Sequence, residues 1–218
     1  DVTLDELRRQ GYKAFFVAIG LQGGRTAGVP GEDAAGVETG IDFLRRMNAD
    51  DTQKLTGRTV VIGGGNVAVD VARTALRAGS EAVTMLCLEG ENEMPAARDE
   101  VAEAKHEGIT VQNGWGPKEI LTDNGKVTGV VFKKCVRVLD ENHRFAPQYD
   151  ENDTITVPCE NVLTAIGQKA LWGGLLDGSK AVLRGNGTVE AEPVTLQTAQ
   201  PDIFAGGDIY HGARFAID

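Results

Sequence analysis

The sequence predicts an α/β protein built around a doubly wound parallel sheet, and three observations lead to this expectation. Apolar, strand-like runs alternate with helix-like segments between residues 59 and 112. The helix-like segments stop at Gly79 and Gly108, and glycine is a common residue just after a helix. A turn of three glycines joins the first strand to the first helix. Strand, helix, strand, helix, strand is the order typical of a parallel sheet.

The segment before residue 59 predicts further elements. Thr3 to Gln10 has the pattern of a short capped helix, and the apolar run from Tyr12 to Ile19 is long enough for a buried strand. Glycine and proline are frequent in residues 20 to 36, which therefore indicate a crossing between domains. A second short helix is expected from Gly40 to Met47.

The central region supplies the sheet. Strands are expected at residues 59 to 62, 82 to 88 and 109 to 112, because these runs are apolar and rich in β-branched residues. A helix from Asn66 to Arg77 follows from apolar residues at helical spacing, and a second helix is expected around residues 97 to 104.

Residues 119 to 166 predict an antiparallel β-meander. Strand-like segments lie on both sides of Asp123-Asn124-Gly125, which is a hairpin signal, and extended segments continue at 154 to 157 and 161 to 166. A last short strand, residues 203 to 205, leads into Gly206-Gly207-Asp208 and the start of a helix. The C-terminus interrupts this pattern, so we expect the chain to end inside a domain of a longer protein.

Composition excludes several functions. A formal net charge of −10 argues against nucleic-acid binding, and no run of about 18 apolar residues or basic leader indicates a membrane span or secretory signal. A cytoplasmic protein is expected. The three cysteines form no CxxC pair and the three histidines no metal or triad pattern, so neither a metal site nor a catalytic side chain is predicted. These residues are Cys87, Cys135, Cys159, His106, His143 and His211.

The glycine turn carries the most specific signal. Gly63-x-Gly65-x-x-Ala68 follows an expected strand and opens an expected helix, which is the context of a Rossmann dinucleotide-binding fingerprint. A pyrophosphate must approach the N–H groups at the helix start, and side chains at the two glycines would block it. The alternative is a glycine-rich turn that binds no ligand. Asn66 is as well suited to cap the helix as to contact a cofactor.

Glu89 ends the second expected strand, about 20 residues beyond the fingerprint, where an acidic residue binds the adenosine ribose hydroxyls. This position favours NAD over NADP. The alternative is a solvated loop charge, because Glu91 and Glu93 stand beside it.

Seven segments in this order resemble the glutamate synthase small (β) subunit family of FAD- and NAD(P)-dependent oxidoreductases. They are GYKAFFVAIG (11 to 20), VPGED (29 to 33), GRTVVIGGGNVAVDVARTALRAG (57 to 79), EMPA (93 to 96), GPKEIL (116 to 121), NVLTAIGQ (161 to 168) and PDIFAGGDIYHGA (201 to 213). In this family the NAD(P) domain is inserted into an FAD domain. The resemblance therefore implies partial FAD-domain segments at 1 to 35 and 168 to 218, and an NAD(P)-binding domain at 36 to 167.

The resemblance also implies the binding residues. Those for NAD(P) are Gly63, Gly64, Gly65, Asn66, Val67, Ala68, Leu88, Glu89, Glu93, Met94, Pro95, Ala165, Ile166, Gly167 and Gln168. Gly207 and Asp208 match the FAD-binding segment, in which the acidic residue holds the ribityl chain.

Two departures from the family pattern matter. The upstream FAD fingerprint and the iron-sulfur cysteine domain do not occur in these 218 residues, so we expect FAD in the full-length parent and little FAD on this chain. Cys87-Leu88-Glu89 stands where the family commonly has Tyr-Arg-Arg, so the cations that would meet a 2′-phosphate are absent there. Both Leu88 and Glu89 therefore favour NAD(H). Arg73, Arg77 and Arg98 are the residues that could reverse this preference by folding over the ribose.

The expected function is hydride transfer between a nicotinamide dinucleotide and FAD, with an electron-transfer domain or subunit carrying iron-sulfur clusters as partner. One alternative is a regulatory dinucleotide-binding module without turnover. Another is a flavoprotein dehydrogenase or disulfide reductase with a different domain arrangement, although the missing CxxC argues against a thioredoxin reductase type.

Overall fold

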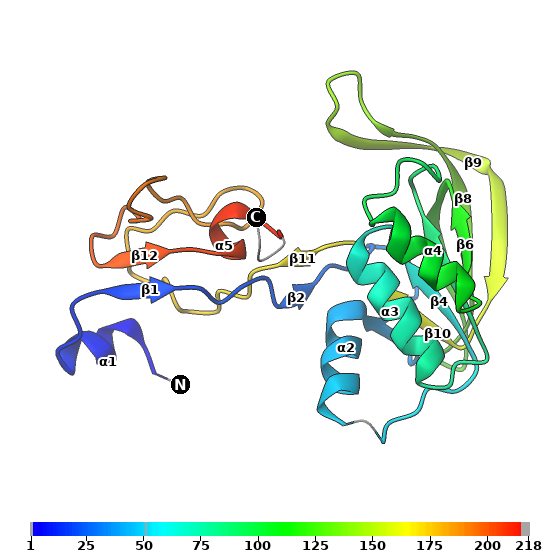
Figure 1. Ribbon diagram of the computed structural model, residues 1–218, viewed down its shortest axis with the longest axis horizontal. Coiled ribbons are helices and arrows are strands. Elements are labelled where there is room, and N and C mark those ends of the chain that lie inside the picture. Colours follow the sequence, from blue (N-terminus) through cyan, green and yellow to red (C-terminus); the bar gives the residue numbers. More distant parts are fainter. Residues whose placement is uncertain (1, 51, 215–218) are drawn as a thin grey trace. The chain divides into compact units, whose positions relative to one another are not determined.

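The computed structural model describes residues 2–50 and 52–214, and the chain divides into two compact units (Figure 1). Unit 1 comprises Asp1–Gly23 and Gln168–Asp218, and unit 2 comprises Gly24–Gly167. The chain passes between them through two short strands, β2 (Gly23–Gly24) and β11 (Gln168–Lys169). None of the helices in the described part of the chain is long and apolar enough to cross a membrane.

Unit 2 contains a five-stranded parallel sheet in the order β3-β10-β4-β5-β6, so the predicted α/β fold with a parallel sheet is confirmed. The strands are β3 (Val37–Thr39), β4 (Arg58–Ile62), β5 (Ala82–Cys87), β6 (Thr110–Asn113) and β10 (Asn161–Thr164). Three helices accompany them: α2 (Gly40–Ala49), α3 (Asn66–Arg77) and α4 (Arg98–His106).

The two faces of this sheet are covered differently. Alternate residues of a strand point to opposite faces. Val61 packs with Phe43, Val71 and Val101 of the helices, whereas Val60 and Ile62 pack with residues of an antiparallel sheet. Helices therefore cover one face and the antiparallel sheet covers the other, which buries the central strand β4 on both sides.

Helix α3 has the predicted bounds. Its buried face consists of Ala68, Val69, Val71, Ala72 and Ala75, which are small or β-branched and allow the helix to lie close to the sheet. The helix ends at Arg77 with Ala78 as its C-cap, and Gly79 follows with a φ of +109°. Glycine adopts this left-handed conformation without a steric cost, which explains the stop.

The predicted antiparallel meander is formed by β7 (Trp115–Asp123), β8 (Lys126–Leu139) and β9 (Phe145–Pro158). Asn124 and Gly125 have φ values of 49° and 76°, as a tight hairpin turn requires. The expectation that residues 161 to 166 continue the meander is wrong. Residues 161–164 form β10, which enters the parallel sheet between β3 and β4 because Val162 and Leu163 are apolar, point to opposite faces and are buried on both.

The first boundary between units also differs from the expected one after residue 35. It lies between Gly23 and Gly24, because the segment that follows packs on the meander. Ile120 N donates to Pro30 O at 2.9 Å, and Val127 N donates to Ala35 O at 3.1 Å. Val29 and Ala34 pack against the same apolar cluster.

Unit 1 is smaller and contains α1 (Leu4–Arg9), β1 (Phe15–Val17), β12 (Ile203–Ala205) and α5 (Asp208–His211). Strands β1 and β12 pair in parallel, and Val17, Val189, Ile203, Ala205 and Ile209 form the buried cluster. The strand expected over residues 12 to 19 is limited to three residues, because the chain meets its partner β12 only there.

A bidentate ion pair links α1 to Asp202, the residue before β12. Arg8 Nε lies 2.6 Å from Asp202 Oδ2, and Arg8 Nη2 lies 3.1 Å from Oδ1. Gln200 Nε2 also donates to Asp202 at 2.8 Å. These donors, Arg8 above all, lower the pKa of Asp202 from 3.8 to about 2.

We expect Asp202→Asn to lower the free energy of unfolding at pH 7 by at most about 2 kcal/mol. Because the folded pKa is depressed, the carboxylate stabilises the fold above about pH 4, and this contribution is lost as the pH falls toward 2. Thermal unfolding at several pH values should show the variant and the parent converge in acid. The exposed Glu190→Gln is the control. Equal stability of parent and Asp202→Asn at pH 7 would contradict the prediction.

Candidate functional site

The turn between β4 and α3 uses its glycines for two different purposes. Gly63 has a φ of +146°, and a Cβ atom there would collide with the backbone oxygen of Ala165. Gly65, the N-cap of α3, has ordinary extended angles (φ −92°, ψ 174°), and a Cβ atom there would have nothing within 4 Å. The fold therefore requires glycine at position 63, whereas Gly65 leaves open space in front of the helix.

The start of α3 is suited to an anion. The first N–H groups of any helix lack intrahelical acceptors, and the helix dipole places partial positive charge at them. Here Ala68 N and Val69 N donate to Gly65 O, at 2.9 and 3.3 Å, and the space beside the Gly65 Cα is open for at least 4 Å around a Cβ position. A phosphate group is the kind of ligand that binds such a helix start.

Of the two roles left open for Asn66, the structure does not show helix capping. The N-cap is Gly65, without a side-chain capping bond, and Asn66 Oδ1 instead accepts from Ala97 N at 2.8 Å. A second bond joins the same segments, from Ala96 N to Gly64 O at 3.0 Å. These two bonds hold the end of the EMPA segment beside the glycine turn.

Glu89 lies against the glycine turn. A Cβ atom on Gly64 would be 2.8 Å from Glu89 Oε2. Gly114 N and Asn113 Nδ2 both donate to Glu89 O at 3.1 Å, which fixes the backbone after β5. Glu91 differs, since it pairs with Lys105 at 2.7 Å.

A cavity of about 450 Å³ opens in front of this turn, within the size range of small-molecule sites. We call it the fingerprint cavity. The residues that line it are Ala27, Ile62, Gly63, Gly64, Gly65, Leu86, Cys87, Leu88, Glu89, Pro95, Trp115, Pro117, Phe145, Pro147, Tyr149, Ala165, Ile166 and Gly167.

The other residues named from the sequence lie elsewhere. Ala68 is fully buried in the helix-side core, against which Val67 and Met94 also pack. Glu93 lines a neighbouring cavity. Gln168, Gly207 and Asp208 belong to unit 1, where Gly207 has a φ of +69° and Asp208 begins the four-residue helix α5.

Sequence reasoning missed the wall that the meander contributes. Phe145, Pro147 and Tyr149 line the cavity from β9, and Trp115 and Pro117 line it from β7. In each strand these residues are two positions apart, so they share one face. This alternation was the available signal. Because no strand was expected around residues 145 to 149, the alternation there was not interpreted as one face of a strand.

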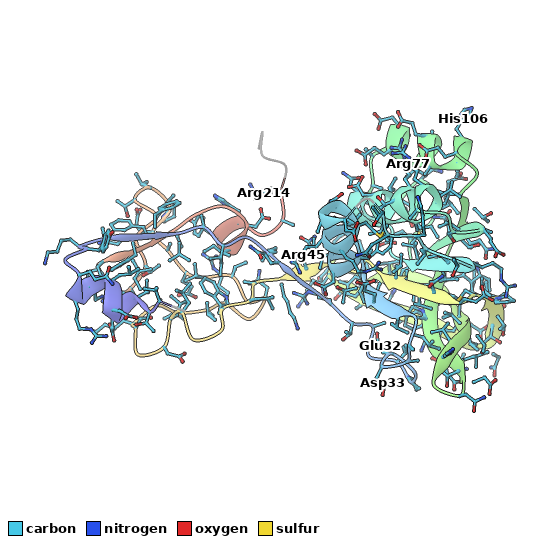
Figure 2. The ribbon with its side chains drawn as sticks, turned by 90° about the horizontal axis from the view of Figure 1, so that it is seen from below. Glu32, Asp33, Arg45, Arg77, His106 and Arg214 are labelled. Atoms are coloured by element: carbon cyan, nitrogen blue, oxygen red, sulfur yellow. The ribbon has the colours of Figure 1, made fainter. Side chains whose placement is uncertain are left out.

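The three arginines that could have met the ribose lie away from the fingerprint cavity. Arg73 and Arg77 both pair with Glu107, each at 2.6 Å, and Figure 2 shows Arg77 near His106, the last residue of α4. Arg98 lines a separate cavity with Glu91 and Lys105. None of these three lines the fingerprint cavity.

The three cysteines are buried thiols. All three are free and buried. Burial raises the pKa of Cys87 to about 12, helped by the nearby Glu89 charge, and burial raises that of Cys159 to about 12 as well. Both remain neutral thiols near neutral pH, since thiolates are the reactive form. Across residues 2–50 and 52–214, no group of three or more His, Cys, Asp or Glu side chains could hold a metal ion.

A family described as pyridine nucleotide-disulphide oxidoreductase matches residues 1–217. The chain belongs to this family. It is 40% identical over its whole length to the NADP(+)-dependent formate dehydrogenase subunit beta of Moorella thermoacetica, covering 31% of that protein. It is 32% identical, again over its whole length, to the glutamate synthase [NADPH] small chain of Escherichia coli K12, covering 49% of it. The resemblance predicted from the motifs is thus confirmed, and the chain spans about a third to a half of the length of these oxidoreductases.

Solved structures of this fold agree with the architecture. Mycobacterium tuberculosis FprA in complex with NADPH matches 99% of this chain with a TM-score of 0.77, at 19% identity and over 62% of its own length. Thioredoxin reductase of T. acidophilum matches 91% of this chain and 58% of its own, with a TM-score of 0.65 and 20% identity. At these identities the likeness shows the fold alone.

Proposed function

We propose that unit 2 binds a nicotinamide dinucleotide and, in the full-length protein, presents it to FAD for hydride transfer. The observation that carries this proposal is the open space at Gly65, between the start of α3 and the Glu89 carboxylate. A side chain at position 65 would fill this space, which fits a pyrophosphate against the helix N–H groups. Family membership adds that such domains belong to oxidoreductases.

The chain's own residues have distinct tasks in this proposal. The α3 start holds the pyrophosphate, and Glu89 accepts hydrogen bonds from the adenosine ribose hydroxyls. Ala165, Ile166 and Gly167 also line the cavity, and we propose that the nicotinamide extends toward them. When bound, the nicotinamide supplies the hydride, and no acid or base from this chain is needed. Gly207 and Asp208 are proposed to contribute to FAD binding in the full-length protein.

The proposal includes a preference for NAD(H) over NADP(H). Its support is the Glu89 carboxylate beside Gly64, with Leu88 as the neighbouring cavity residue and no arginine lining the fingerprint cavity. The relatives named above carry NADP(+) or NADPH in their names, but identities of 40% and 32% do not determine the residues at these two positions.

The partner is proposed from the same family likeness. Several relatives are named as subunits or small chains, including a subunit beta of an NADPH-Fe(3+) oxidoreductase from Geobacter sulfurreducens that is 38% identical over 176 residues. We propose an electron-transfer domain or subunit carrying iron-sulfur clusters as the partner, in the cytoplasm. A net charge of −10 favours neither nucleic acid nor an acidic membrane surface.

The test uses the full-length protein. We expect it to purify with flavin absorbance that NADH bleaches under anaerobic conditions, more efficiently than NADPH. Gly65→Val in the same protein is expected to retain the flavin but lose bleaching at the same NADH concentration. A colourless full-length protein that still binds NADH would contradict hydride transfer and indicate a regulatory module.

A further inference from the structure

The β8-β9 hairpin of the meander extends beyond β7, the third strand of that sheet. Trp115, the first residue of β7, pairs with Lys134, so from that point β8 pairs with β9 alone. We call residues 134–149 the meander arm. Figure 1 shows this olive-coloured hairpin projecting beyond the parallel sheet of unit 2. An isolated two-stranded ribbon is marginally stable in water. We therefore expect the side chains of the meander arm to make further contacts.

The arm carries large apolar side chains that are exposed. Phe145 is 68% exposed and Leu139, its cross-strand partner, is 42% exposed. Val136 is 62% exposed. Contiguous exposed apolar groups commonly mark a binding surface.

These side chains face a second cavity, which we call the arm cavity. It has a volume of about 570 Å³ and lies between the arm and the loop after β5. Its lining consists of Glu89, Glu93 and Pro95 from the loop and of Val136, Arg137, Val138, Leu139 and Phe145 from the arm. Glu89, Pro95 and Phe145 also line the fingerprint cavity, so the two cavities adjoin at Glu89.

This continuity identifies the occupant. In a dinucleotide, the adenosine ribose lies between the pyrophosphate and the adenine. With the pyrophosphate at Gly65 and the ribose at Glu89, the adenine extends beyond Glu89, where the arm cavity lies. The arm offers what an aromatic base needs, namely an aromatic ring and apolar contacts.

Arg137 is the cation on the arm that is available for such a base. Lys134 lies over Trp115 at 4.6 Å, and Arg144 lies 3.7 Å from Asp140. Within the part of the chain that the structure describes, no ion pair or hydrogen bond engages the Arg137 guanidinium, although the group lines the arm cavity. A guanidinium can stack on a flat ring.

We propose that the meander arm is the adenine-binding element of this protein, with Phe145 stacking on the base and Arg137 contacting its other face. The proposal rests on the proposed function, because it needs a dinucleotide in the fingerprint cavity. It adds that residues outside the nucleotide-binding sheet and helices determine affinity for the adenosine half.

The test compares ligands with and without an adenine in the full-length protein. We expect Phe145→Ala and Arg137→Ala each to weaken NADH binding by about 10-fold, since one stacked base contributes on that order. Binding of reduced nicotinamide mononucleotide, which lacks the adenosine, should be unchanged in both variants. Phe145→Tyr should restore NADH affinity, and Arg144→Ala, which removes the same charge from the arm tip, should leave it unchanged.

Each outcome decides the proposal. Unchanged NADH affinity in Phe145→Ala, while the unmodified protein binds NADH, overturns the adenine site and leaves the proposed function intact. A loss in Arg137→Ala that is confined to NADPH would show a 2′-phosphate contact instead and overturn the Arg137 role. No binding of NADH to the unmodified protein would overturn both proposals.

Discussion

Gly65→Val is expected to weaken dinucleotide binding by at least about 100-fold while leaving the protein folded. Gly65 has extended angles that valine adopts readily, and its Cβ would meet no atom within 4 Å. The added branches would occupy the space where a pyrophosphate reaches the α3 N–H groups. Charge-assisted hydrogen bonds contribute about 1.5 to 3 kcal/mol each, so the loss of two removes at least about 3 kcal/mol.

Two other glycines give the controls for this prediction. Gly185→Val also meets no atom within 4 Å but lies in unit 1, and it should leave dinucleotide affinity unchanged. Gly63→Val should unfold the protein, because of the positive φ and the clash with Ala165 O. Calorimetric titration with circular dichroism on each variant separates binding from folding. Unchanged affinity in a folded Gly65→Val would remove the fingerprint from the mechanism.

The double change Leu88→Arg with Glu89→Arg is expected to invert the cofactor preference from NADH to NADPH. A carboxylate about 5 Å from a phosphate charge, at an effective dielectric near 20, opposes it by roughly 3 kcal/mol before screening. Salt and water reduce this several-fold, which leaves a preference on the order of 10-fold. Two arginines would remove the repulsion and offer a fork to the 2′-phosphate.

A matched control separates this local effect from net charge. Glu91→Arg makes the same charge change as Glu89→Arg on the same loop, but Glu91 pairs with Lys105 and does not line the fingerprint cavity. We expect Glu91→Arg to retain the preference for NADH. If both changes shifted the preference equally, the long-range field and not Glu89 would determine it.

The elements predicted well are those whose signals are local in sequence. The strand, the glycine turn and α3 lie within 20 residues of one another, and their pattern predicts Asn66–Arg77 as the structure has it. The antiparallel hairpin at Asn124 and Gly125 was predicted for the same reason. The positions of Glu89 and Gly64 follow from neighbouring strands that end at one edge of a parallel sheet.

Two of the misses involve partners distant in sequence. The placement of β10 depends on pairing with β4, about 100 residues earlier in the chain, which periodicity cannot show. The hydrogen bond that Ala97 N donates to Asn66 Oδ1 spans 31 residues, so local capping rules could not indicate it. The sequence around Phe145 has the composition of a loop. Its position at the arm cavity follows from the pairing of Phe145 with Leu139 in the β8-β9 hairpin.

Titration of the unmodified protein with NADH and with NADPH, at one ionic strength, tests the central claim most directly. The claim is that the space between the α3 start and Glu89 holds the pyrophosphate and ribose of NAD(H). We predict that NADH saturates at one per chain and binds at least about 10-fold more tightly than NADPH. NADPH binding as tight as NADH would contradict the role of Glu89, and the absence of saturable binding by either would contradict the dinucleotide site itself.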